Sequence, residues 1–305
     1  MTDSDDGLVR LWQPPHDVDL PRVLSPLQRG KGDPTCAYGP GEYWRTATTA
    51  RGAATLRLTS DTDGIRARAW GAGASLVLET VPDLLGAADD AHGFDAVHDV
   101  VARGVRTAPG LRLCATRRVW DVLVAAILEQ KVTGREAWRS WRELCRRFGS
   151  AAPGPAPEGL RVVPDPTQLR AIRDWEWHRA GVDGARRKTL LAAASVAGSL
   201  EKAVGFGGVE GRRHLRHVPG IGVWTAAEVA QRAWGDPDAV SIGDYHLPTI
   251  VGLALTGSPL DDDGMLEALA PYEGHRHRAV RYMNAAGVSR PRFGPRMPVR
   301  DYRSR

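Results

Sequence analysis

The chain has 305 residues, of which 42% are hydrophobic and 25% charged, and its formal net charge is +5. This composition excludes global disorder, and the length suits two domains of ordinary size. No run of eighteen apolar residues occurs, the acidic start lacks an apolar signal core, and three scattered cysteines are too few for a four-cysteine cluster. We therefore expect a cytoplasmic protein without a membrane segment or an iron–sulfur cluster.

The first third of the chain has the pattern of a β-rich domain. Residues 1–40 are rich in proline and turn-forming residues. An Asp63-Gly64 pair is typical of a hairpin turn, and segment 76–85 has the pattern of a short helix. Bulky and polar residues alternate, with arginines on one face, in three segments: 43–48, 54–59 and 65–70. This period of two predicts a half-exposed antiparallel sheet within a β-rich domain over residues 1–110.

Helical patterns replace the strands from residue 111 onward. Apolar residues of segment 119–130 fall on one helical face, and Thr133 with Glu136 forms a capping box for a second helix that ends at Gly149. A Pro/Gly-rich loop over 152–166 is predicted on the surface, and helical texture then resumes. The fold class that we predict is α+β, with an all-helical domain over 111–290 and a basic tail over 291–305.

A glycine turn separates two short helices in the middle of the helical region. Val218-Pro219-Gly220-Ile221-Gly222 connects a basic segment, 210–217, to a predicted helix, 223–234. Two glycines spaced by one residue allow a tight reversal and leave amide N–H groups where the dipole of the second helix favours an anion. Ile221 is expected to pack between the two helices, and Arg216 to bring a guanidinium to a phosphate there. An ordinary αα-hairpin is the alternative.

The fuller string is more specific than the glycine turn. Val-Pro-Gly-Ile-Gly-Val-Trp-Thr-Ala-Ala, over residues 218–227, resembles the hairpin of the helix-hairpin-helix (HhH-GPD) base-excision DNA glycosylases, especially their 3-methyladenine branch. The resemblance is strong over 111–290 and weak over the β-rich domain. It implies that Val218, Gly220, Ile221, Gly222 and Arg216 hold the backbone of double-stranded DNA. It also implies a sodium or potassium ion on the carbonyls of Val218 and Gly220.

An aspartate follows the hairpin by about twenty residues, in Val240-Ser-Ile-Gly-Asp-Tyr-His-Leu-Pro248. The resemblance places the superfamily's catalytic carboxylate on Asp244. Such a carboxylate stabilises the oxocarbenium-like sugar that forms as the base leaves, and it helps to orient water. An aspartate at this place would also suit a helix N-cap, which is the alternative role.

The second residue after the hairpin is Trp224. The bifunctional glycosylase-lyases of the superfamily carry a Schiff-base lysine there, and tryptophan cannot form an imine, so we expect no lyase activity. The resemblance instead implies that Trp224 walls a base pocket, and we place Tyr282 of the last helix in the same pocket. Helix packing is the alternative role of Trp224. Glu228, one helical turn later, departs from the alkylpurine enzymes, which have an aromatic residue there.

A second motif lies upstream of the hairpin. Segment 126–133 resembles the family's Ile-Leu-x-Gln-x-Val segment, which inserts a wedge into the duplex beside the flipped base. The match puts Gln130 on the motif's glutamine and Lys131 on the wedge position, and both residues are expected to contact DNA. Lysine departs from the apolar wedge of the alkylation glycosylases, and a plain solvent-facing turn is its alternative reading.

Together these residues predict a monofunctional DNA glycosylase of base excision repair. We expect a monomer that acts on damaged bases, alkylated purines above all, in double-stranded DNA, and that is nucleoid-associated if bacterial. A glycosylase for an oxidised purine or uracil, and a non-catalytic protein that binds DNA damage, are the alternatives. A metal-dependent hydrolase is disfavoured because no acidic partner completes a ligand set around the histidine pairs. These pairs are His214 with His217 and His275 with His277.

Overall fold

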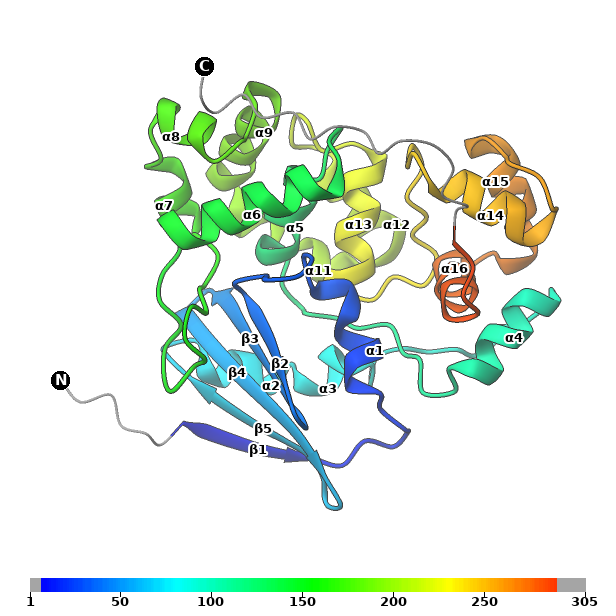
Figure 1. The fold of residues 1–305 in the computed structure, drawn as a ribbon, viewed down its shortest axis with the longest axis horizontal. Coiled ribbons are helices and arrows are strands. Elements are labelled where there is room, and N and C mark those ends of the chain that lie inside the picture. The colour runs from blue at the N-terminus through cyan, green and yellow to red at the C-terminus, as the bar shows by residue number, and fades with distance from the viewer. Residues whose placement is uncertain (1–6, 290–305) are drawn as a thin grey trace.

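The computed structural model describes residues 7–289, in which a five-stranded antiparallel sheet lies against a larger helical part (Figure 1). The strand order is β1-β5-β4-β3-β2. The strands are β1 (Leu8–Trp12), β2 (Cys36–Gly39), β3 (Glu42–Thr49), β4 (Gly52–Asp61) and β5 (Gly64–Trp70). The three strands predicted from alternation are β3, β4 and β5. The edge strands β1 and β2 lie in the segment predicted as turns, because short edge strands are defined by their partners more than by their own pattern.

The sheet is covered on both faces. Ile65, Ala67 and Ala69 of β5 are buried on one face, whereas Arg66 between them is exposed. On the opposite face the rings of Trp44 and Trp70 stack with centroids 5.5 Å apart and pack against Leu160. Leu160 belongs to the Pro/Gly-rich loop that was predicted as a surface excursion. The loop lacks a periodic apolar pattern, so its packing against the sheet left no signal in the sequence.

Eighteen helical segments accompany the sheet in the described range 7–289. Before and beside the sheet are α1 (Leu20–Leu24), η1 (Ser25–Leu27), α2 (Ala74–Glu79), α3 (Val81–Leu84) and α4 (Asp99–Thr107). The next are α5 (Trp120–Leu128), α6 (Gly134–Phe148), α7 (Pro166–Arg170), α8 (Asp174–Arg179), α9 (Gly184–Ser195), α10 (Ala197–Leu200) and α11 (Ala203–Phe206). The last are α12 (Gly208–Leu215), α13 (Val223–Ala233), α14 (Leu247–Leu255), α15 (Asp262–Ala268), η2 (Ala270–Tyr272) and α16 (Arg276–Ala285).

Helix α5 is the central helix, since all nine of its residues are buried. The capping box predicted for the next helix is present: the backbone N–H of Thr133 donates to Glu136 Oε2 over 3.0 Å, and that of Glu136 donates to Thr133 Oγ1. Helix α6 then ends at Phe148, directly before Gly149, as predicted. No helix in the described part of the chain is long and apolar enough to cross a lipid bilayer.

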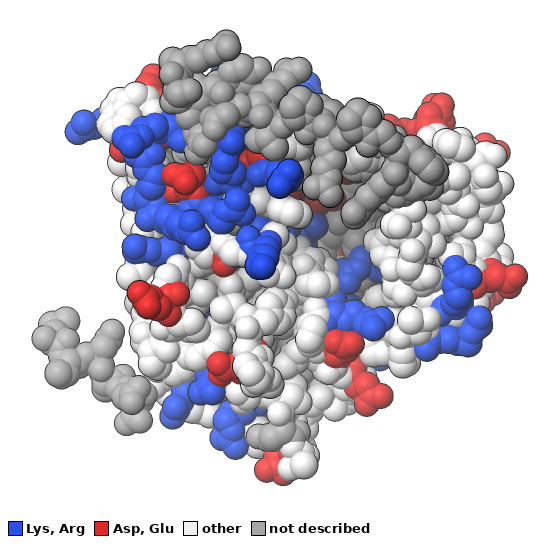
Figure 2. All heavy atoms as spheres, in the orientation of Figure 1, with Lys and Arg blue, Asp and Glu red and all other residues white. Residues whose placement is uncertain are grey.

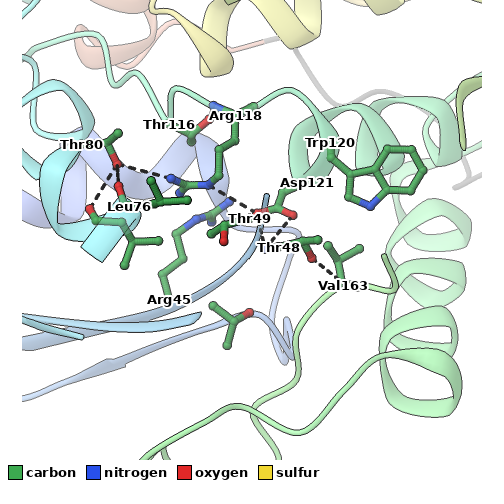
Figure 3. A network of polar contacts seen from close by, with 12 residues as sticks. Arg45, Thr48, Thr49, Leu76, Thr80, Thr116, Arg118, Trp120, Asp121 and Val163 are labelled. Atoms are coloured by element: carbon green, nitrogen blue, oxygen red, sulfur yellow. Dashed lines mark hydrogen bonds and ion pairs between the residues drawn. The ribbon is translucent and has the colours of Figure 1, made fainter. Parts of the chain in front are cut away.

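A buried polar network fixes the start of α5 to the sheet (Figure 3). The carboxylate of Asp121 accepts from the backbone N–H of Thr48 on β3 at 3.2 and 3.3 Å, and Arg118 Nε lies 4.0 Å away. Arg118 also donates to Thr80 Oγ1, between α2 and α3, over 3.3 Å. Burial raises the pKa of Asp121, and Arg118 opposes that shift. The other end of α5 leads into the segment of Gln130 and Lys131. The network therefore fixes the position of the helix that precedes this segment.

Two large buried apolar clusters make up most of the core of the described chain. The larger joins the sheet to α5, α9 and α13, and the smaller joins α4, α14, α15 and α16. Figure 1 shows α4 and α16 together on the side of the molecule away from α7, α8 and α9. The smaller cluster supplies the buried apolar residues Leu111, Val240 and Val280 to the cavity described below.

Candidate active site

The turn between α12 and α13 requires glycine at its first glycine position. Gly220 has φ +92°, and a Cβ added there would lie 2.0 Å from Thr189 Oγ1 on α9. Val218 and Ile221 on either side are buried, and the N–H of Ile221 donates to the Val218 carbonyl over 3.0 Å. The turn is therefore tight and is packed directly on α9.

The second glycine of the turn lies at an open helix start. Gly222 is exposed at φ −87°, and an added Cβ would meet no described atom within 4 Å. No described side chain caps the first amides of α13. Arg212 and Arg213 are ion-paired with Asp236 and Glu210, whereas the exposed Arg216 has no ion pair with a described residue. Open amides and one guanidinium are therefore left for an anion, as in other helix N-terminal phosphate sites.

Gln130 fastens this turn to the segment after α5. Its Nε2 donates to the Gly220 carbonyl over 3.0 Å and to Thr225 Oγ1 on α13 over 2.8 Å. The structure thus brings together Gln130 and the hairpin, which are separated by some ninety positions in the chain. The side chain that was predicted to contact DNA has a second role here, because it positions the hairpin.

Lys131 has an unusual backbone. It is exposed, and its φ of +54° lies in the left-handed region, which among described non-glycine residues is shared only with Arg117. The chain just before it is held twice, by the hydrogen bonds of Gln130 and by Arg186 Nη1, which donates to the Leu128 carbonyl over 2.8 Å. Backbone strain maintained by its surroundings in this way is common at functional positions.

Asp244 is joined to two helices at once. Its Oδ1 accepts from the backbone N–H groups of His246 and Leu247 at 2.8 and 2.9 Å, at the start of α14. Its Oδ2 accepts from Trp224 Nε1, on the first turn of α13, at 3.1 Å. The carboxylate therefore supports the helix start and also faces a cavity, so the capping role and a chemical role are compatible at this residue.

The cavity beside Asp244 has a volume of about 600 Å³ and lies between α13, α14, α16 and the short helices α1 and η1. Such a volume is sufficient for a nucleobase. Tyr282 does not line it: this side chain is 6% exposed and stacks on Phe94 with ring centroids 5.5 Å apart. Trp224, which was predicted to wall the pocket, is not among the lining residues either; it is half-buried, and its indole N–H donates to Asp244. The charged or strongly polar lining residues are Arg22, Glu228, Gln231, Arg232, Asp244, His246, His277, Arg281 and Asn284.

Most of these polar groups were not found from the sequence. Glu228 accepts from Ser241 Oγ at 2.5 Å and pairs with Arg232 at 2.8 Å. Burial lowers the pKa of His277 well below its ordinary value, and the cations of Arg281 and its neighbours add to that shift, so His277 is neutral. His277 and Arg281 lie one helical turn apart on α16, which is the local signal that could have paired them.

The described residues contain no group of three side chains that could hold a metal ion. His214 Nε2 lies 2.8 Å from the Ser199 carbonyl, which is a hydrogen bond and not a metal-ligand arrangement. The carbonyls of Val218 and Gly220 each accept one hydrogen bond, so a monovalent cation there would use their second lone pairs. That cation stays a prediction. The predicted basic tail over 291–305 lies outside the described residues.

A basic surface follows the segment of Lys131. Figure 2 shows Lys and Arg side chains gathered on the face that α6 forms. Helix α6 begins three residues after Lys131 and carries Arg135, Arg142 and Arg146, of which the first and last are exposed. Guanidinium groups spaced along one helix are the pattern expected of a surface that contacts phosphates.

The sequence is similar to curated DNA repair proteins over part of its length. It is 30% identical over 145 residues to the probable bifunctional transcriptional activator/DNA repair enzyme AlkA of Mycobacterium tuberculosis, covering 47% of this chain and 29% of that one. It is 29% identical over 119 residues to the thymine-DNA glycosylase of Aeropyrum pernix, covering 39% and 47%. The chain thus spans less than half the length of either relative. No protein-family model matches it.

The fold is shared with solved glycosylases over nearly the whole chain. The 3-methyladenine DNA-glycosylase from Archaeoglobus fulgidus matches with a TM-score of 0.69 and 14% identity, covering 90% of this chain and 97% of that one. The 8-oxoguanine glycosylase/lyase of Clostridium acetobutylicum, in complex with double-stranded DNA, matches with a TM-score of 0.67 and 10% identity, covering 92% and 97%. The chain is therefore similar in sequence to curated DNA repair proteins over less than half of its length, and it shares its fold with solved DNA glycosylases.

Proposed function

We propose that the protein is a monofunctional DNA glycosylase that removes damaged bases by hydrolysis and leaves an abasic site. The observation that carries this proposal is the position of Asp244, whose carboxylate is held by α13 and α14 and faces a cavity large enough for a base. A protein that only binds damaged DNA has no use for a fixed carboxylate at this place. The names of the relatives, which are DNA repair enzymes and glycosylases, support the same conclusion.

Asp244 would act on the sugar. Breaking the N-glycosidic bond develops positive charge at C1′, and a preorganised carboxylate stabilises that charge without moving. The two backbone N–H donors on Oδ1 and the indole on Oδ2 fix the carboxylate in the cavity wall. The same carboxylate is placed to orient the water that completes the hydrolysis.

Lyase chemistry has no amine to use in this cavity. The chain has four lysines, Lys31, Lys131, Lys188 and Lys202, and none of them is among the described residues that line the cavity. Trp224 occupies the position where the bifunctional enzymes of the superfamily carry their lysine, and its nitrogen donates to Asp244. We therefore propose hydrolysis without a Schiff-base intermediate.

DNA would bind across the hairpin and the basic face of α6. The open amides at the start of α13, together with Arg216, suit one phosphate, and Lys131 with the α6 arginines suits the strand beyond it. We propose that the protein binds as a monomer. Affinity should fall steeply with salt if phosphate contacts dominate.

Two classes of damaged base are candidates. The resemblance of the Trp224 segment to the alkylpurine branch, and the names of the AlkA and 3-methyladenine relatives, favour alkylated purines. The polar lining of the cavity favours the second class, which is an uncharged lesion such as an oxidised purine or uracil.

The test is a base-release assay on duplexes that each carry one defined lesion. We expect free base and an abasic strand that breaks only after alkali or heat. Asp244→Asn should reduce release at least about 100-fold, because asparagine keeps an oxygen for the α14 amides but loses the charge. Asp263→Asn, an exposed aspartate on α15, is the matched control. Undiminished release by Asp244→Asn would refute the mechanism, and borohydride trapping of a covalent adduct would refute its monofunctional form.

A further inference from the structure

The wall of the cavity is polar. A site for a cationic base would be expected to offer an aromatic surface on which the base could stack. The only rings among the described lining residues are the imidazoles of His246 and His277. Cationic bases are bound well by aromatic faces or by unpaired carboxylates. The carboxylate of Glu228 already pairs with Arg232 and accepts from Ser241, so it offers little net negative charge to a ligand.

One guanidinium in the wall lacks a carboxylate. Arg281 makes a single hydrogen bond, from Nη2 to the Arg22 carbonyl at 3.4 Å, and no ion pair with any residue of the described range. Burial lowers its pKa and the nearby Arg232 adds to that shift, whereas Cys114 and Asp89 oppose it. His277, one turn away on the same helix, is neutral and can donate or accept a hydrogen bond. This corner of the cavity is therefore an electropositive donor site.

The charge of the leaving base distinguishes the two lesion classes. When water hydrolyses the bond, the C1′–N electron pair leaves with the base, the water oxygen adds to C1′, and one water proton is released, which ends on the base only where the base has left as an anion. An alkylated cationic purine leaves neutral and needs no cation beside it. An uncharged base leaves as an anion, and a partly buried guanidinium in the cavity wall stabilises that negative charge strongly.

We infer that the cavity takes an uncharged keto base, with Arg281 donating to a keto oxygen and stabilising the base as it leaves with negative charge. The inference rests on the proposed glycosylase activity and specifies its substrate class. Glu228 supplies an acceptor for a lactam N–H in the same site, so a base that offers both N–H and C=O, as hypoxanthine, uracil and 8-oxoguanine do, matches the wall on both counts.

The test compares single-turnover base release from four matched duplexes containing hypoxanthine, uracil, 8-oxoguanine or 7-methylguanine. We expect at least one keto base to be released with a larger acceleration over its spontaneous loss than 7-methylguanine. Arg281→Gln should slow release of that base about 100-fold and leave release of 7-methylguanine within about twofold. Arg281→Lys should recover part of the loss. Arg106→Gln, an exposed arginine on α4, is the matched control.

The outcomes separate this inference from the proposed function. Preferential release of 7-methylguanine, or an equal effect of Arg281→Gln on every lesion, overturns the substrate class and leaves the glycosylase activity standing. No release from any duplex overturns both. If Arg281→Gln does not fold, the order of the four lesions with the unaltered protein decides the question alone.

Discussion

The indole Nε1 of Trp224 lies 3.1 Å from Oδ2 of Asp244, so the first turn of the hairpin's second helix holds the candidate catalytic carboxylate directly. The other oxygen of Asp244 is bound at the start of α14. A phosphate held at the open amides of α13 would therefore be tied to the carboxylate through one rigid helix turn. This arrangement joins binding of the DNA backbone to the position of the chemistry.

Replacing Trp224 by phenylalanine tests that connection. Trp224→Phe keeps an aromatic ring on the first turn of α13 and removes the donor to Asp244. A hydrogen bond to a charged group contributes about 1.5–3 kcal/mol, so we expect base release to slow about tenfold or more. Affinity for an abasic duplex should change less than about twofold, because no phosphate contact is lost. Trp175→Phe, at an exposed position on α8, is the control, and equal rates for the two variants would contradict the prediction.

The two glycines of the hairpin should respond differently to alanine. At Gly220, a left-handed φ and a Cβ position 2.0 Å from Thr189 Oγ1 predict a loss of about 3 kcal/mol in the free energy of unfolding. At Gly222 the added Cβ meets open space, so the loss should be about 1 kcal/mol or less. Gly222→Ala should nevertheless weaken DNA binding about tenfold, because its methyl group intrudes on the open amides. Urea unfolding and DNA titration measure the two effects, and unchanged DNA affinity of Gly222→Ala would argue against a phosphate there.

Features set by neighbouring residues could be predicted from the sequence. The alternation in β3 to β5, the capping box of Thr133 and Glu136, and the start of the second hairpin helix at Val223 each depend on a few consecutive residues. Edge strands β1 and β2 were missed, because their conformation depends on pairing with β5 and β3.

Features set by distant residues could not be predicted. The hydrogen bond from Gln130 to the Gly220 carbonyl joins segments far apart in the chain, and no local pattern encodes it. Tyr282 was placed in the base pocket, but it faces the apolar cluster of α4 and α16, and the next position back, Arg281, reaches the cavity. Successive side chains on a helix point in directions about 100° apart. The sequence does not define how α16 is rotated about its axis, so the residue predicted to line the cavity was one position away from the residue that does.

A glycine at position 131 distinguishes the effect of the lysine side chain on activity from the effect of its strained backbone on stability. Lys131→Gly relieves a left-handed conformation at φ +54°, so the free energy of unfolding should stay equal or rise by about 1 kcal/mol. If the lysine side chain enters or supports the duplex, base release from double-stranded DNA should nonetheless fall about tenfold, and release from single strands should not. A variant as active as the unaltered protein on duplex DNA would show that Lys131 is only a turn residue.

The neutral His277 predicts a pH dependence of stability. Burial, and then the cations of Arg281, Arg232 and Arg278, lower its pKa well below the ordinary value of 6.5. The native state therefore does not bind a proton near pH 6, whereas the unfolded chain does. Because the unfolded state binds more protons, stability is complete above pH 6.5 and is lost as the pH falls below it. The loss continues until the native pKa is reached.

His277→Gln should remove this part of the pH profile. Between pH 7.5 and pH 5.5 the unaltered protein should lose about 1 kcal/mol more unfolding free energy than the variant, from the histidine alone. The two carboxylates on the cavity wall, Glu228 and Asp244, are unchanged in the variant. Urea midpoints at the two pH values measure the difference, with His92→Gln at an exposed position as control. Parallel profiles for the unaltered protein and His277→Gln would mean that the native cavity accepts a proton there despite its arginines.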